Sequence, residues 1–271
     1  MKRNWGSALV LFVLCAFVAT ISGGAWCAAP VAPAEKIKVL VVTGGHDFEK
    51  EPFFAMFKAL DGIVVETAEQ KETSEAYDGD LTKYDVIVLY DMVQKITDTQ
   101  KQKLVMYLGS GKGLVGLHHS LGSYQDWGDF QKIIGGKFYT AAREEDGMKH
   151  PTSGWKHDEK LKVQIADKSH PIAQGLRISE FEILDEVYNK FSVRADVKPL
   201  LTVEHPLSKK VIGWTQLCGK APVVYIQLGH GASAFNDANY RKLLSNAIGW
   251  AAGRAPGQKA QTPPTTPARR S

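Results

Sequence analysis

The stretch GLVGLHHSLG, residues 113–122, joins a predicted buried strand to a group of polar side chains at its end. Its first five residues are an apolar run with glycines, which is typical of a strand covered on both faces. The run stops at His118 and His119. Ligands of open α/β sheets bind beyond the carboxyl ends of the strands, so two histidines at such an end raise the question of a functional site.

Strands and helices alternate before and after this stretch. Thr97 is a suitable N-cap for one of the helices. The predicted strands are 36–45, 62–69, 83–92 and 113–119, and the predicted helices are 51–60, 97–111 and 126–136. This alternation predicts a parallel sheet with helices on both faces.

The pattern changes after residue 137, where strands follow one another with few helices between them. We expect an antiparallel extension at one edge of the sheet. Its predicted strands are 161–167, 181–191, 198–205 and 210–216. A buried strand at 221–231 and an amphipathic helix at 236–253 then complete a single domain, residues 36–253.

Both ends of the chain differ from this domain. Residues 1–27 predict a secretory signal peptide, with an apolar core at 8–21 that is too short to span a bilayer, and cleavage is expected between 27 and 34. Trp26 is a poor residue before a lipoprotein cysteine, so lipidation of Cys27 is not expected. Residues 28–35 predict a linker, and residues 254–271, rich in Pro and Thr, predict a disordered tail. We therefore expect a periplasmic or secreted protein without a membrane span.

Charge and cysteine content exclude two classes of protein. Six of the 33 basic residues lie in the predicted signal and tail, which contain no acid, so 27 basic residues face 29 acidic ones in between. Such a balance offers no basic surface for nucleic acid. Only Cys218 lies within the predicted domain, so no internal disulfide is expected.

Histidines stand at three predicted strand ends. His46 and Asp47 follow the first strand, His118 and His119 follow the fourth, and His230 follows the last parallel strand. Because the carboxyl ends of parallel strands meet at one edge of a sheet, we expect these imidazoles to share a site.

Six motifs in this order resemble the ThuA-like (trehalose utilisation) family over about residues 36–252. They are KVLVVTGGHDFE, GKGLVGLHHS, IIGGKF, HPIAQGL, DEVYN and YIQLGHG. The resemblance implies a flavodoxin-like fold of the class I glutamine-amidotransferase type. It also implies a link to disaccharides such as trehalose and to their keto derivatives.

Amidotransferases of this fold carry a cysteine on a tight strand-to-helix turn, and a late-strand histidine activates it. In this sequence His118 stands in the place of the cysteine, and His230 resembles the late-strand histidine. Ala232 stands where the orienting acid is expected. Glutamine hydrolysis through a thiolate is therefore not expected.

Two chemistries fit the predicted histidine site. In the first, His46, His118 (or His119 in its place) and His230 bind a divalent metal such as zinc, with Glu186 or Asp185 nearby and one position open for water. In the second, His118, His119 or His230 acts without a metal as general base or acid, and the acidic partner is Asp47, Glu49 or Glu186. The sequence leaves both open.

Further residues are candidates for substrate binding. Glu186 and Tyr188 are expected on one strand face, and Tyr124 and Trp127 offer aromatic faces beside the histidine pair. His46 and Asp47 complete the predicted substrate-binding set, whereas His150, His157 and His170 are expected to be loop or structural residues. The expected function is an exported enzyme, hydrolase- or lyase-like, acting on a small sugar or keto-sugar. The alternative is a non-catalytic domain that binds a sugar or another ligand.

Overall fold

The computed structural model describes residues 35–145 and 147–254. The predicted signal peptide and nearly all of the predicted linker and tail lie outside these ranges, so those assignments stay predictions. Within the described ranges, no helix combines the length and apolar character that a bilayer crossing requires.

The elements follow the predicted order closely and add several short ones. Thr97 caps α2 in a capping box with Gln100, as its position suggested. In chain order the elements are β1 (Ile37–Gly44), α1 (Lys50–Lys58), β2 (Ile63–Gln70), η1 (Glu75–Tyr77), η2 (Leu81–Lys83), β3 (Val86–Asp91), α2 (Asp98–Gly109), β4 (Gly113–Leu117), η3 (His118–Gly122), α3 (Gly128–Ile134), β5 (Gly136–Lys137), β6 (Arg143–Glu145), β7 (Met148–His150), β8 (Gly154–Ile165), α4 (Pro171–Gln174), β9 (Glu180–Asn189), β10 (Ser192–Val193), β11 (Lys198–Val203), β12 (Val211–Cys218), β13 (Ala221–Ile226), α5 (Ala232–Phe235) and α6 (Ala238–Ala251).

Nine strands form one sheet in the order β2-β1-β3-β4-β13-β12-β11-β8-β9. The first five strands are parallel, in the strand order of flavodoxin. The remaining pairings are antiparallel. The predicted α/β fold, a parallel sheet with an antiparallel edge extension, is therefore confirmed.

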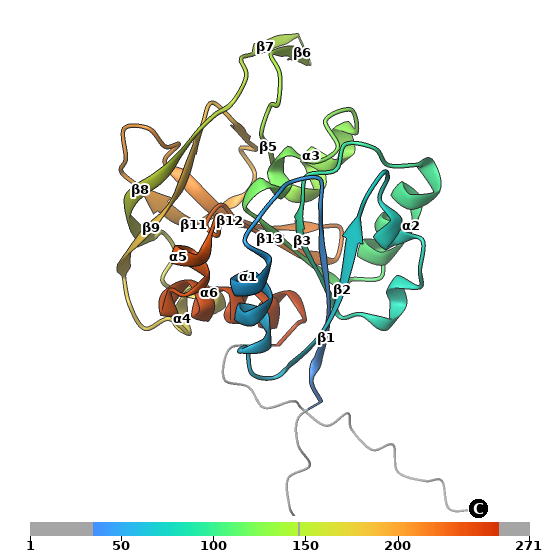
Figure 1. Cartoon of the computed structure of the whole chain (residues 1–271), viewed down its shortest axis with the longest axis horizontal. Coiled ribbons are helices and arrows are strands. Elements are labelled where there is room, and N and C mark those ends of the chain that lie inside the picture. The colour runs from blue at the N-terminus through green and yellow to red at the C-terminus, as the bar shows by residue number, and fades with distance from the viewer. Residues whose placement is uncertain (1–34, 146, 255–271) are drawn as a thin grey trace, which may run out of the picture. The chain divides into compact units, whose positions relative to one another are not determined.

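Helices cover both faces of the parallel part (Figure 1). Helices α1, α4, α5 and α6 pack on one face, where Phe53, Phe57 and Leu244 meet the strand residues Val41 and Val88. Helices α2 and α3 pack on the other face. Strands β1, β3, β4 and β13 are thus buried on both sides, which explains their nearly continuous apolar runs, whereas the edge strand β2 is partly exposed.

The direction of the added strands determines what they bring to the site. Four successive antiparallel pairings separate β13 from β9, so β9 runs in the same direction as the parallel strands. The carboxyl end of β9 and the amino end of β8 therefore reach the same edge as the ends of β1, β3, β4 and β13.

Candidate active site

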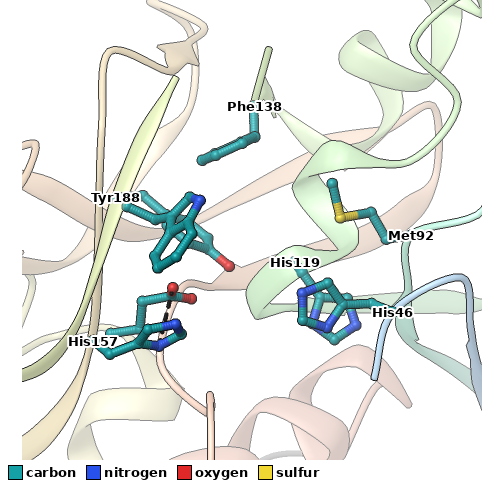
Figure 2. Close-up of a pocket in the computed structure, with 8 residues that line it drawn as sticks. His46, Met92, His119, Phe138, His157 and Tyr188 are labelled. Carbon is teal, nitrogen blue, oxygen red and sulfur yellow. Dashed lines mark ion pairs between the residues drawn. The ribbon is translucent and has the colours of Figure 1, made fainter. Parts of the chain in front are cut away.

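An open pocket of about 340 Å³ lies at this edge. Figure 2 shows His157 and Tyr188 on one side of it, with His46, His119 and Met92 on the other. The lining residues are His46, Met92, His119, Phe138, Trp155, His157, Glu186 and Tyr188. The pocket thus combines imidazoles, one carboxylate and aromatic faces, as small-molecule sites commonly do.

His118 lies at a sharp turn between β4 and η3. Its φ of 47° is left-handed, a conformation that is costly for a residue with a side chain and that recurs at functional sites. The turn is the one at which related folds expose a nucleophile. The backbone therefore matches the amidotransferase comparison, although the side chain is an imidazole.

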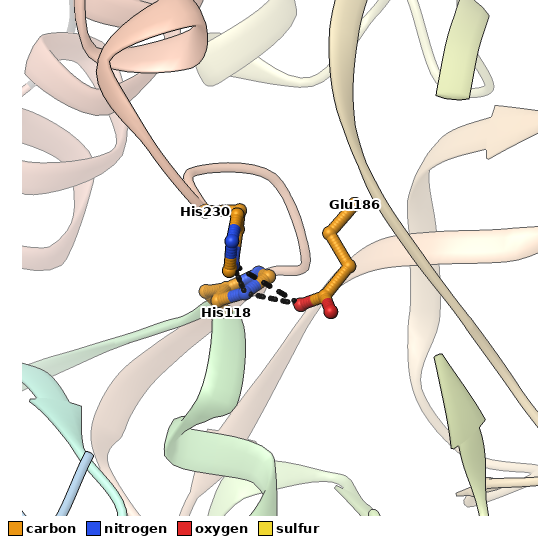
Figure 3. A group of neighbouring side chains, drawn as sticks. All are labelled: His118, Glu186 and His230. Atoms are coloured by element: carbon orange, nitrogen blue, oxygen red, sulfur yellow. Dashed lines mark hydrogen bonds and ion pairs between the residues drawn. The ribbon is translucent and has the colours of Figure 1, made fainter. Parts of the chain in front are cut away.

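The His118 ring is fully buried, and hydrogen bonds at both of its nitrogens fix its orientation. Its Nδ1 lies 2.7 Å from the carbonyl of Gln227, so Nδ1 is the donor. Its Nε2 lies 2.8 Å from Oε2 of Glu186 and 2.9 Å from the hydroxyl of Tyr188. Figure 3 shows His118, Glu186 and His230 converging from three segments of the chain.

Strand β9 supplies Glu186 and Tyr188 by ordinary alternation. The two side chains stand two residues apart and both contact His118, as the period of a strand requires. Asp185 serves a different purpose, because its carboxylate accepts the backbone N–H groups of Gly229 and His230 at 2.7 and 2.9 Å.

His230 is held by the loop that follows β13. Gly229 adopts a φ of 110°, and a Cβ there would lie 2.3 Å from the hydroxyl of Tyr240. This tight turn, together with Asp185, brings Nδ1 of His230 to 3.2 Å from Nε2 of His118 and 3.3 Å from Glu186. The three donor atoms lie within 4.8 Å of one another.

In this cluster the imidazoles favour the ionised form of Glu186, and Glu186 favours the protonated form of His230. Burial by itself raises the pKa of Glu186, but hydrogen bonds with His118 and His230 outweigh it and hold the pKa well below its usual range. The hydrogen bond with Glu186 raises the pKa of His230 above its ordinary value, against the effect of burial. The carboxylate is thus kept ionised inside the protein.

His157 belongs to the site, although the sequence suggested a loop residue. The pairing of β8 with β9 is irregular between Lys156 and Glu159, and Asp158 there has a φ of 58°. Such a bulge redirects side chains. Nδ1 of His157 lies 3.4 Å from Oε1 of Glu186, and its ring contacts those of Trp155 and His230.

His119 and His46 form the opposite wall. Nε2 of His119 donates to the carbonyl of Tyr90 at 3.1 Å. Burial, followed by the nearby His118 and His46, lowers the pKa of His119 well below its usual value. The His46 ring stacks on His119 at 4.4 Å, and its Nδ1 donates to the carbonyl of Asp47. His46 is therefore a wall residue, outside the converging group of His118, Glu186 and His230.

The predicted aromatic residues do not line the pocket. Tyr124 is 1% exposed, and its hydroxyl bonds to Gln70, Ser74 and Asp91 in a buried polar network. Trp127, the N-cap of helix α3, packs beside it against the apolar side chains on the face of the sheet that α2 and α3 cover. Their position after the histidine pair takes them into the core below the site, and Trp155 and Phe138 supply the aromatic faces instead.

Three further residues have structural positions. Asp47 is exposed and contributes its backbone carbonyl to His46. Nδ1 of His170 accepts the N–H of Ile172 and so caps α4, consistent with the structural role expected from the sequence. Cys218 ends β12 as a free, partly buried thiol whose pKa burial raises, and it is remote in the fold from the turn at His118.

Comparisons with known proteins agree with this fold. The ThuA family model, described as trehalose utilisation, matches residues 38–251. No curated protein matches the chain.

Solved structures match over most of the chain. A ThuA-like protein from Parabacteroides merdae has a TM-score of 0.71 at 18% identity, over 83% of this chain and 93% of its own. A ThuA-like protein from Bacteroides uniformis has a TM-score of 0.62 at 23% identity, over 84% and 98%. A β-galactosidase from Bacillus circulans has a TM-score of 0.52 at 11% identity, over 83% of this chain and only 32% of its own. At these identities the matches show the fold alone.

Proposed function

The chain belongs to the ThuA family, and from this premise we propose that it is an exported enzyme that acts on a sugar or keto-sugar in this pocket. The substrate class follows from the family's description, trehalose utilisation. Export follows from the predicted signal peptide.

One observation carries the proposed chemistry. Both oxygens of Glu186 face imidazoles at the pocket, Oε2 toward His118 and His230 and Oε1 toward His157. A carboxylate that orients an imidazole is a common arrangement for general acid–base catalysis. His157 is 43% exposed and lines the pocket, so a substrate can reach this imidazole.

The presence of one carboxylate among the residues lining the pocket favours a lyase-like reaction over glycoside hydrolysis. Glycoside hydrolysis commonly needs two carboxyl groups that flank the scissile bond. Among the residues lining the pocket, Glu186 is the one carboxylate, and its neighbour Asp185 is occupied by backbone N–H groups. The set fits removal of a proton from a hydroxyl, or from a carbon beside a carbonyl, and so favours lyase-like chemistry on a keto-sugar.

The aromatic side chains would hold the sugar ring. Trp155 stands opposite Tyr188 in the β8–β9 ladder, and both line the pocket with Phe138. Aromatic faces bind the apolar face of a sugar while polar groups reach its hydroxyls. This arrangement places a bound ring beside His157 and Glu186.

The test measures turnover and binding separately. Trehalose, other disaccharides and their keto derivatives are assayed with wild-type protein, Glu186→Gln and His157→Gln, and affinities are measured by calorimetry. Turnover is expected to fall by about 100-fold or more in both variants, with affinity changed only a few fold. His205→Gln is the control, because His205 pairs with Glu159 outside the pocket at 3.2 Å.

Two outcomes would contradict the enzyme. Binding of a sugar without turnover of any candidate would identify a non-catalytic sugar-binding domain. Turnover that is unchanged in Glu186→Gln would remove the proposed acid–base group.

A further inference from the structure

We propose that His118, Glu186 and His230 bind one divalent metal ion. The inference rests on the proposed function for its catalytic meaning only, since metal binding itself needs neither sugar nor turnover. It also replaces the ligand set suggested by the sequence, because Glu186 takes the place of His46.

The positions of the donor atoms are the first support. Nε2 of His118, Oε2 of Glu186 and Nδ1 of His230 are separated by 2.8, 3.2 and 3.3 Å. Nitrogen and oxygen ligands lie about 2.0–2.2 Å from zinc, so tetrahedral ligands lie roughly 3.4 Å from each other. Small outward movements of the side chains would therefore admit an ion at the centre.

The lone pairs are the second support. Nδ1 of His118 donates to Gln227, which leaves Nε2 as the acceptor of the neutral ring. That nitrogen faces a carboxylate oxygen at 2.8 Å, and two acceptors at this distance need a proton or a cation between them. With protons alone, the N–H groups of His118 and His230 would converge on one oxygen while 3.2 Å from each other. The Tyr188 hydroxyl, 2.9 Å from Nε2 of His118, is a further donor to that nitrogen, but one cation satisfies all three lone pairs at once.

The surrounding contacts are the third support. Metal-bound histidines usually donate their other N–H to a carbonyl or carboxylate, as His118 does to Gln227. Asp185 fixes the backbone at Gly229 and His230, so the ligand loop has a set position. Glu186 lines the pocket and the side chain of His230 is 32% exposed, so water or substrate can approach the cluster from that side.

The ligand types indicate the class of ion. Two imidazoles and one carboxylate suit zinc, iron(II), cobalt, nickel or manganese, whereas calcium and magnesium prefer oxygen ligands alone. With the ion bound, Oε1 of Glu186 remains available to His157, so the exposed imidazole keeps its partner.

Metal analysis tests the inference directly. The full chain, purified without a histidine tag, is incubated separately with Zn²⁺, Mn²⁺, Co²⁺ and Fe²⁺ (the last under exclusion of oxygen), desalted and analysed by mass spectrometry of its metals. We expect one equivalent of at least one of these ions per chain. Glu186→Gln and His230→Ala are expected to weaken the binding by about 10- to 100-fold or more.

Three variants act as controls. His205→Gln removes a histidine that faces a carboxylate without a second imidazole, and His157→Gln removes the partner of Oε1. His46→Ala removes the ligand suggested by the sequence. All three are expected to retain the metal, and the visible absorption of Co²⁺-loaded wild-type protein reports its ligand field without any variant.

Several results would overturn the inference. These are a wild-type protein that retains none of the four ions, metal retained in both Glu186→Gln and His230→Ala, or metal lost in His46→Ala. Protein that retains none of the four ions and still turns over a sugar would overturn the inference and leave the proposed function standing. Stoichiometric metal without turnover of any sugar would support the inference and contradict the proposed function.

Discussion

Two buried carboxyl groups at the same edge of the sheet, Glu186 and Asp91, have pKa values shifted in opposite directions. Glu186 meets three imidazoles beside an open pocket. Asp91, at the end of β3, is fully buried and meets the amide of Gln70 at 2.7 Å and the hydroxyl of Tyr124 at 3.2 Å.

Burial acts on both carboxyl groups, and the difference in their charge comes from their hydrogen-bond partners. Burial raises the pKa of Asp91 to about 7, because the hydrogen bonds from Tyr124 and Gln70 oppose it only in part. Burial acts in the same direction on Glu186, but there the imidazoles prevail and the pKa falls. One carboxyl group is therefore suited to carry charge next to a ligand, and the other is a structural acid that is best kept neutral.

The largest predicted effect is the pH dependence that Asp91 gives to folding. Between about pH 4 and pH 7 the folded state keeps a proton that the unfolded chain has released, so stability falls as pH rises. The loss reaches up to about 4 kcal/mol, and Asp91→Asn should abolish it. Urea unfolding of both proteins across this range measures the difference. An equal pH dependence in the two would show that Asp91 is ionised at little cost.

A second effect should come from Asp185, the buried carboxylate that serves the backbone. Asp185→Ala leaves the N–H groups of Gly229 and His230 without their acceptor. The free energy of unfolding should fall by about 3 kcal/mol, with a smaller loss in Asp185→Asn, which keeps one acceptor oxygen. Chemical denaturation checks this order. Equal losses in the two variants would mean that packing, not hydrogen bonding, holds the loop.

A variant of Tyr124 tests whether the hydrogen-bond network around Asp91 has a structural role only. Tyr124→Phe removes the hydroxyl shared by Ser74, Gln70 and Asp91. We expect a loss of about 1.5 kcal/mol in stability, with sugar turnover unchanged. A loss of turnover at full stability would place Tyr124 in substrate binding, as its sequence position suggested.

The smallest effect on stability should come from Trp155, which is 58% exposed. Trp155→Ala should change the free energy of unfolding by no more than about 0.5 kcal/mol. Its effect should appear in sugar affinity, weakened about three- to tenfold because a stacking face is lost. Calorimetry on the ligand found in the turnover assay measures this, and unchanged affinity would exclude Trp155 as the sugar platform.

The sequence predicted those parts of the site that depend on strand direction. His118 and His230 follow parallel strands, and the carboxyl ends of such strands share an edge, so their meeting was predictable. Glu186 and Tyr188 were predictable as a pair from the two-residue period of a strand. The alternation of strands and helices predicted the parallel sheet and its antiparallel extension, and the resemblance to the ThuA-like family implied the flavodoxin-like fold.

The sequence did not predict features that depend on long-range register. His157 reaches Glu186 through a bulge in the β8–β9 pairing, and no local signal marks that irregularity. Tyr124 comes shortly after the histidine pair, yet the turn at η3 takes it into the core. His150, expected to be a loop residue, instead ends strand β7 and pairs with Arg143 of β6 in a hairpin.

The left-handed backbone at His118 has a consequence for how such a protein can change its chemistry over evolutionary time. The turn fixes the point from which the side chain leaves the main chain, whatever residue stands there. A different reactive group at this position would find Glu186 and His230 already in place. Relatives could therefore exchange one reaction for another by substitution at a single turn, without rebuilding the sheet around it.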